Sequence, residues 1–120
     1  LLKGDVGHDV LVGLDGADLL DGGAGADTLT GGAGADLFLL EAPHGQTLST
    51  ADLITDFQVG VDHLHLPGSV TFASLQIVQG DPASNGGLAS ESLVIDGGSG
   101  DILARLANVD AASVTQASFG

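Results

Sequence analysis

Cysteine, tryptophan and tyrosine are absent from this chain of 120 residues, and basic side chains are nearly absent. Without cysteine the chain can form neither a disulfide nor a thiolate zinc site, so any bound metal should be a hard cation held by oxygen atoms. Lys3 and Arg105 stand against 16 acidic residues, which gives a formal net charge of −14. Nucleic-acid affinity comes largely from basic residues that neutralise phosphates, so this charge excludes a nucleic-acid binder. It equally excludes attachment to an anionic membrane surface through basic residues.

Long hydrophobic runs are also lacking. The longest one extends from Leu37 to Leu40, whereas a membrane-spanning helix needs roughly 20 apolar residues, so no transmembrane segment is expected. Apolar residues nevertheless make up 43% of the chain, and we expect it to fold despite its charge. Because the chain begins at Leu1 without a methionine or a leader sequence, we interpret it as a piece of a longer protein.

Glycine, in contrast, is abundant, with 20 residues, and it recurs in a ninefold pattern. Four successive units starting at residue 4 read GDVGHDVLV, GLDGADLLD, GGAGADTLT and GGAGADLFL. Every unit has Gly at its first and fourth places. The sixth place is always Asp (Asp9, Asp18, Asp27, Asp36), and the eighth is always a large apolar residue (Leu11, Leu20, Leu29, Phe38).

This pattern predicts the local structure of each unit. The first six residues are rich in glycine and form a tight turn, and the last three form a short strand. Side chains alternate along a strand, so the eighth-place residue faces inward and its two neighbours face outward. Two units complete one coil of a flattened solenoid, and units two apart therefore stack on the same edge.

Stacking brings the sixth-place aspartates together. Asp9 should lie above Asp27, and Asp18 above Asp36, at the spacing of about 4.8 Å between paired strands. Bare carboxylates at that distance repel, and the repeats offer no Lys or Arg between them. Carboxylates and turn carbonyls supply the six or more oxygen ligands that Ca²⁺ takes, whereas Mg²⁺ demands stricter octahedral geometry. We therefore predict Ca²⁺ as the cofactor. The alternative, that these residues only form turns, does not require Asp at one place in every unit.

The four units resemble the glycine-rich nonapeptide of the RTX (repeats in toxin, haemolysin-type calcium-binding) family, G-G-x-G-x-D-x-U-x. The resemblance covers residues 4–39, and Asp5 and Leu14 depart from it at the second place. It implies a parallel β-roll (right-handed β-solenoid) with ions between stacked turns. The side chains of Asp15 and Asp21 are interpreted as solvated. The implied metal ligands are the carboxylates of Asp9, Asp18, Asp27 and Asp36 and the backbone carbonyls of Gly4, Val6, Gly13, Asp15, Gly22, Ala24, Gly31 and Ala33.

The ninefold pattern ends at Leu39. We divide the chain into an RTX roll at 1–40 and a C-terminal β capping region at 41–120. The stretch 52–66, D-x-I-x-D-F-x-x-G-x-D-x-L-x-L, is similar to the segment that follows the repeats in secreted RTX proteases. There it continues the roll as a capping β structure. Residues 101–119 resemble RTX C-terminal ends, so this region could include part of the secretion signal. Further strands are predicted at 70–78, 92–96 and 102–109, with a hairpin turn at 97–100. We expect a β-sandwich-like cap that buries Leu64, Leu66, Leu103 and Leu106.

Three further aspartates follow the repeats. Asp52, Asp56 and Asp62 could complete an ion site against the last turns, because no further repeat lies above them. The alternative is that Asp56 and Asp62 cap turns. His63 and His65 leave the same face of a strand and could ligate zinc or copper. No third ligand is identifiable, which favours a solvated strand face.

The motifs of the enzymes considered are absent. The chain has neither the HExxH motif of zinc proteases nor the GxSxG motif of lipases, and nothing marks the paired carboxyls of a glycosidase. We therefore expect this segment not to be an enzyme, although the longer protein could be one.

The function predicted from these features is a Ca²⁺-binding RTX β-roll module of a secreted bacterial protein, located outside the cell or on its surface, which folds on meeting calcium. The resemblance implies export by the type I secretion machinery. The alternative is a carbohydrate- or surface-binding module appended to a secreted enzyme or surface-layer protein, with a polysaccharide or a second copy as partner. The absence of Trp and Tyr counts against carbohydrate stacking.

Overall fold

The computed structural model describes residues 2–40, 51–66, 70–81, 83, 90–98 and 100–119. The elements in this part of the chain are β-strands and single turns of 3-10 helix, so the chain is all-β, as the sequence predicts. None of its helical turns is long and apolar enough to cross a membrane. The 3-10 turns are η1 (Phe72–Ser74), η2 (Ala111–Ser113) and η3 (Gln116–Ser118).

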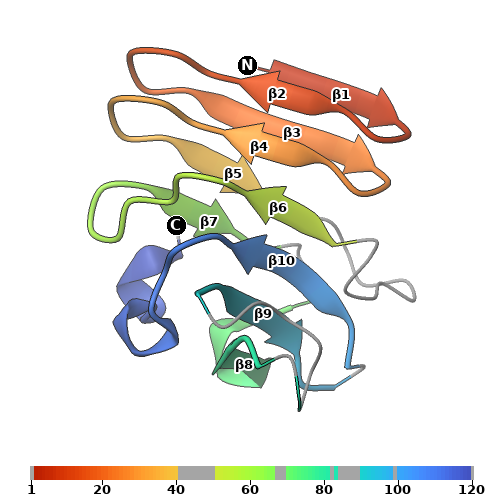
Figure 1. The fold of residues 1–120 in the computed structure, drawn as a ribbon, viewed down its shortest axis with the longest axis vertical. Coiled ribbons are helices and arrows are strands. Elements are labelled where there is room, and N and C mark those ends of the chain that lie inside the picture. Colours follow the sequence, from red (N-terminus) through yellow and green to blue (C-terminus); the bar gives the residue numbers. More distant parts are fainter. Residues whose placement is uncertain are drawn as a thin grey trace.

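The strands form two sheets, and successive strands of the repeats alternate between them (Figure 1). The smaller sheet is parallel and has the order β1-β3-β5-β7. The larger has the order β2-β4-β6-β10-β9-β8, parallel as far as β10 and antiparallel beyond it. The bounds in the smaller sheet are β1 (Leu2–Val6), β3 (Leu19–Ala24), β5 (Leu37–Leu39) and β7 (His63–His65). Those in the larger sheet are β2 (Val10–Val12), β4 (Thr28–Thr30), β6 (Asp52–Ile54), β10 (Ile102–Leu106), β9 (Ser92–Asp96) and β8 (Leu75–Gln79).

The pairing register follows the nine-residue repeat. Leu11 pairs with Leu29, and Leu20 with Phe38, so each strand pairs with the strand two units further on, as predicted. Leu20, Leu29 and Phe38 have no exposed surface, and burial of each such side chain contributes about 2 kcal/mol. Leu11 lies on β2, at the end of its sheet, and is only partly buried. The eighth-place residues thus form the row of core side chains between the sheets.

Two strands are longer than the repeat predicts. β1 and β3 continue through residues assigned to turns, and their ladder pairs Asp5 with Gly23 and Val6 with Ala24. The two glycine-containing backbones can approach closely here, because a Cβ on Gly4 would collide with the carbonyl oxygen of Gly22. The turns on this edge therefore begin as extended backbone.

The parallel stack continues beyond the repeats through β6 and β7. Leu29 pairs with Ile54 and Phe38 with Leu64, and both new residues are completely buried. The sequence offset between these coils is 25 or 26 residues, instead of the 18 within the repeats. The strands of a third coil therefore lie under the second, with longer connections.

The C-terminal strands differ in part from their prediction. β9 has the predicted bounds and pairs antiparallel with β10 across the predicted hairpin. The predicted strand 70–78 is wrong in its first half, because the N–H and hydroxyl of Ser74 both donate to the carbonyl of Thr71 and close η1. β10 ends before residue 109, since Asn108 has a φ of 58°, which an extended strand cannot accommodate.

The last strands cover the end of the stack (Figure 1). β10 pairs with β6, and Phe119 forms a bridge beside Leu64 on the other sheet. Leu64, Leu103 and Leu106 are buried as expected, whereas Leu66 is partly buried against the core.

Candidate metal centre

One column of aspartates follows one edge of the stacked turns. The backbone N–H of Asp9 donates to Oδ1 of Asp27 at 2.8 Å, and the N–H of Asp27 donates to Oδ1 of Asp52 at 2.9 Å. Asp27 and Asp52 are buried. We call Asp9, Asp27 and Asp52 the first acidic column.

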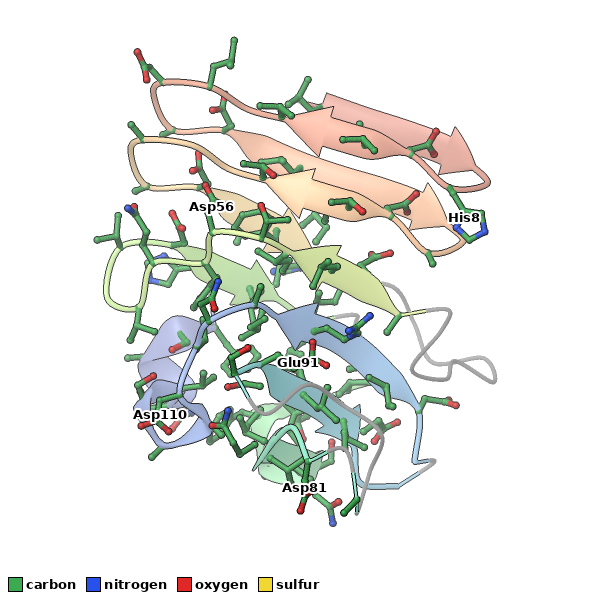
Figure 2. All side chains as sticks on the ribbon, in the orientation of Figure 1. His8, Asp56, Asp81, Glu91 and Asp110 are labelled. Atoms are coloured by element: carbon green, nitrogen blue, oxygen red, sulfur yellow. The ribbon has the colours of Figure 1, made fainter. Side chains whose placement is uncertain are left out.

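The opposite edge carries the second acidic column, formed by Asp18, Asp36 and Asp62. Here the N–H of Asp18 donates to Oδ1 of Asp36, and the N–H of Asp36 donates to Oδ1 of Asp62, both at 2.9 Å. Figure 2 shows the two edges on opposite sides of the molecule, with His8 at a turn of the first and Asp56 at the second. Asp52 and Asp62 thus take the sixth place in the third coil.

The second oxygen of three of these carboxylates has no hydrogen-bond partner. Oδ2 of Asp18, of Asp27 and of Asp36 is buried and accepts no hydrogen bond. Burial raises the pKa of Asp27 and of Asp36, because desolvation disfavours the charged form. A buried anionic oxygen without a donor is costly unless a cation lies beside it.

The first-place glycines make room for these oxygens. A Cβ atom on Gly4 would lie 2.6 Å from Oδ2 of Asp9, and one on Gly13 would lie 2.7 Å from Oδ2 of Asp18. On Gly22 and Gly31 a Cβ would collide with Oδ2 of the aspartate in the same unit. The space beside each Oδ2 therefore exists only because glycine holds the first place.

Backbone carbonyls also lie between stacked turns. The carbonyl oxygen of Gly31 approaches Gly13, and that of Gly22 approaches Gly4. The carbonyls of Gly7, Leu14 and Gly16, which the sequence analysis did not single out, approach the glycines of the next coil. For Gly7 and Gly16, the recurrence of glycine at the fourth place of each unit could have indicated this position. The ligand roles of all eight predicted carbonyls stay predictions: those of Gly4, Val6, Gly13, Asp15, Gly22, Ala24, Gly31 and Ala33.

This donor set fits a calcium ion. Among the described residues no three His, Cys, Asp or Glu side chains converge into a metal-binding group, so an ion would need backbone oxygens as well. Ca²⁺ accepts such mixed shells of carboxylate and carbonyl oxygens in flexible geometry. Asp18, Asp27 and Asp36 would hold it through Oδ2, and bound calcium would supply the positive charge that these oxygens lack.

The remaining predicted residues have varied surroundings. Asp56 accepts hydrogen bonds from the N–H groups of Gly31 and Gly32, at 2.9 and 2.8 Å. Asp15 is exposed, whereas Asp21 accepts a hydrogen bond from the N–H of Gly23. The other sequence-derived candidates are His63 and His65, both on β7; His63 lines a groove of about 410 Å³ with Leu37 and Asp36 among its other walls.

Comparisons with known proteins agree with this geometry. A family model for the RTX calcium-binding nonapeptide repeat matches residues 3–38 with four copies. Among solved structures, the AlgE6R3 subunit of the Azotobacter vinelandii mannuronan C5-epimerase is 25% identical, with a TM-score of 0.64 over 99% of this chain and 78% of that one. The AlgE6R2 subunit of the same epimerase is 22% identical, with a TM-score of 0.63 over 98% and 90%. A search of curated protein sequences gives no match.

The ninefold register, the stacked aspartates and the family match concern the same segment. The family of these repeats binds calcium. Residues 3–38 therefore match four copies of the RTX calcium-binding nonapeptide repeat.

Proposed function

We propose that this chain is a Ca²⁺-binding β-roll module of a secreted bacterial protein and that it folds on meeting calcium outside the cell. One observation carries the proposal: Oδ2 of Asp18, Asp27 and Asp36 is buried without a hydrogen-bond donor. Lys3 is exposed and Arg105 is paired with Glu91, so neither of the two basic residues neutralises these oxygens. A calcium ion would supply the positive charge that balances these carboxylates.

The fold we propose is a right-handed parallel β-roll formed by residues 1–40 and continued by a capping region at 41–120. The parallel pairing of β6 with β4 and of β7 with β5 supports a third coil in the second region. In the order of the larger sheet, the antiparallel strands β9 and β8 lie beyond β10, and they end that sheet without further repeats. A cap is physically expected because an open solenoid end exposes unpaired strand edges.

Calcium binding would make folding of the chain depend on whether it is inside or outside the cell. Extracellular calcium modules have Kd values of about 10⁻⁴ to 10⁻³ M, so their sites stay empty at cytosolic calcium levels and fill outside the cell. In the empty state the stacked carboxylates repel and oppose folding. This supports export of an unfolded chain by the type I machinery implied by the family resemblance. The catalytic activity, if any, would belong to another part of the protein.

Circular dichroism tests the proposal directly. In EDTA the chain should give a coil-like spectrum, and millimolar Ca²⁺ should restore the β spectrum, whereas equal Mg²⁺ should restore far less. A spectrum that is fully β in EDTA and unchanged by Ca²⁺ would contradict the proposal.

A polysaccharide-binding module of a secreted enzyme is the second candidate. Its support is the likeness to two subunits of a mannuronan C5-epimerase. Against it stand the absence of Trp and Tyr and the scarcity of basic residues for an anionic polymer. Titration with mannuronan oligomers at saturating Ca²⁺, with a neutral glucan as comparison, separates the candidates. Saturable binding of either polymer would favour this second function.

A further inference from the structure

We infer that the calcium-binding part of the second acidic column ends at Asp36, and that Asp56 and Asp62 are hydrogen-bonded end-caps instead of metal ligands. The inference rests on the proposed calcium-binding function. It distinguishes two roles for aspartates that look alike in the sequence.

Asp62 differs from Asp36 at a single oxygen. In both residues Oδ1 accepts a backbone N–H from the preceding coil. Oδ1 of Asp62 accepts the N–H of Asp36, and Oδ1 of Asp36 accepts the N–H of Asp18. Oδ2 of Asp36 accepts none, whereas Oδ2 of Asp62 accepts the N–H of Gln58 at 2.9 Å. The Asp62 carboxylate is completely buried. Two N–H donors satisfy it in its ionised form without a cation.

The turn around Asp62 explains this difference. The N–H groups of Val61 and Asp62 both donate to the carbonyl of Gln58, which closes a helical type of turn that no repeat contains. In the second, third and fourth repeats a first-place glycine lies against Oδ2 of the aspartate, and that oxygen accepts no hydrogen bond. Here the backbone N–H of Gln58 points at that oxygen instead.

Asp56 closes the same edge from the other side. Its two oxygens accept the N–H groups of Gly31 and Gly32, one each. In the coil above, the N–H of Gly13 donates to the backbone carbonyl of Thr30 at 2.8 Å. The Asp56 carboxylate thus takes over the acceptor role that the backbone of the next coil has within the repeats.

The two end-caps still act on the ion at a distance. Both carboxylates bring negative charge close to the Asp36 turn, because Oδ1 of Asp62 accepts the N–H of Asp36 and Oδ1 of Asp56 accepts the N–H of Gly31. Removing either end-cap charge should therefore weaken calcium binding modestly without changing the number of ions. Removing a ligand should abolish one site.

Calorimetric titration of the full chain with Ca²⁺ makes this distinction. Asp56→Asn and Asp62→Asn should bind as many ions as the wild type, with affinities lower by no more than about fivefold, as expected for a charge that does not touch the ion. Asp36→Asn, the matched ligand variant, should bind one ion fewer. Amide NMR of the calcium-loaded chains should show perturbed Gly31 and Gly32 resonances in Asp56→Asn, and a perturbed Gln58 resonance in Asp62→Asn.

Loss of an ion in either end-cap variant would overturn the inference while leaving the proposed function intact. Amide resonances that stay unchanged would also overturn it. Should Asp62→Asn fail to fold, Asp56→Asn decides the matter alone, because Asp56 is only partly buried. A wild-type chain that binds no calcium would contradict the proposed function and this inference together.

Discussion

The backbone N–H of Asp9 donates to Oδ1 of Asp27, which lies 18 residues later in the sequence, at a distance of 2.8 Å. Asp18 and Asp36 repeat this relationship on the opposite edge. One carboxylate oxygen therefore holds adjacent coils in register, while Oδ2 of Asp27 and of Asp36 receives no donor. The two oxygens of one carboxylate thus have different surroundings, and only Oδ2 is left for a cation.

Replacement of Asp27 by Asn should abolish one calcium site, as Asp36→Asn should, because Asn keeps an acceptor for the Asp9 N–H but removes the ligand charge. Asp15→Asn is the matched control, since Asp15 is an exposed aspartate of a neighbouring turn. Calorimetric titration measures both. Equal losses in the two variants would mean that bulk charge, and not the geometry of the column, binds the ion.

Alanine at Gly22 should abolish the calcium site at Asp27 and destabilise the chain by about 1–3 kcal/mol, because its Cβ would collide with Oδ2 of Asp27. Gly98→Ala is the control, since the atom nearest its Cβ would be an ordinary contact at 3.5 Å. Urea unfolding at saturating Ca²⁺ gives both free energies. A Gly22→Ala chain as stable as Gly98→Ala would refute the proposed space beside Oδ2.

Glycine at position 14 should stabilise the chain. Leu14 has a φ of 71°, which costs a leucine about 1–2 kcal/mol, and its side chain is 69% exposed, so little burial is lost. The greater entropy of glycine in the unfolded chain offsets part of the gain and leaves about 0.5–1 kcal/mol. Asn108→Gly, at a φ of 58°, should be nearly neutral because Asn tolerates this conformation. Thermal unfolding compares the two, and a lower Tm for Leu14→Gly would contradict the prediction.

Acid should partly replace calcium. Burial raises the pKa of Asp27 and of Asp36 above the ordinary 3.8, so the calcium-free folded chain binds protons more tightly than the unfolded chain. This contribution to stability is fully present below about pH 3.8 and is lost as the pH rises through the raised pKa values. In EDTA, circular dichroism should therefore show β structure gained on acidification. The Asp27→Asn, Asp36→Asn double variant should respond less, and loss of structure in acid would contradict this reasoning.

The ion pair between Arg105 and Glu91 should contribute to stability independently of calcium. Nε and Nη2 of Arg105 donate to the two carboxylate oxygens of Glu91, at 3.0 and 2.9 Å, and the Glu91 side chain is 1% exposed. Arg105→Ala would leave that buried carboxylate without its guanidinium, at a cost of about 3 kcal/mol. Arg105→Lys should recover only part of this stability, because the lysine ammonium group cannot donate to both Glu91 oxygens as the planar guanidinium does. Urea unfolding measures the loss, with the exposed Lys3→Ala as a neutral control.

The repeat region was the part most predictable from sequence. Gly at the first place, Asp at the sixth and a large apolar residue at the eighth are local signals, and a fixed period forces units two apart into the same register. The pairing of Leu20 with Phe38 and the contact between Asp18 and Asp36 follow from that period alone. The bounds of β1 and β3 could not be predicted from the period, because the parallel ladder extends into backbone that the glycine content assigns to turns.

The tertiary structure decided the roles of the aspartates beyond the repeats. From the sequence, Asp56 and Asp62 could either complete an ion site or cap turns. In the structure their oxygens accept N–H groups from Gly31, Gly32 and Gln58. The pairing of each N–H group with an oxygen depends on chain segments beyond the repeats, whose lengths are irregular. The nine-residue period therefore does not predict it. The sequence alone determined that carboxylates stack and require positive charge. Only the folded backbone determined which of those carboxylates are satisfied by hydrogen bonds and which are left for a cation, because that depends on the positions of donors distant in the chain.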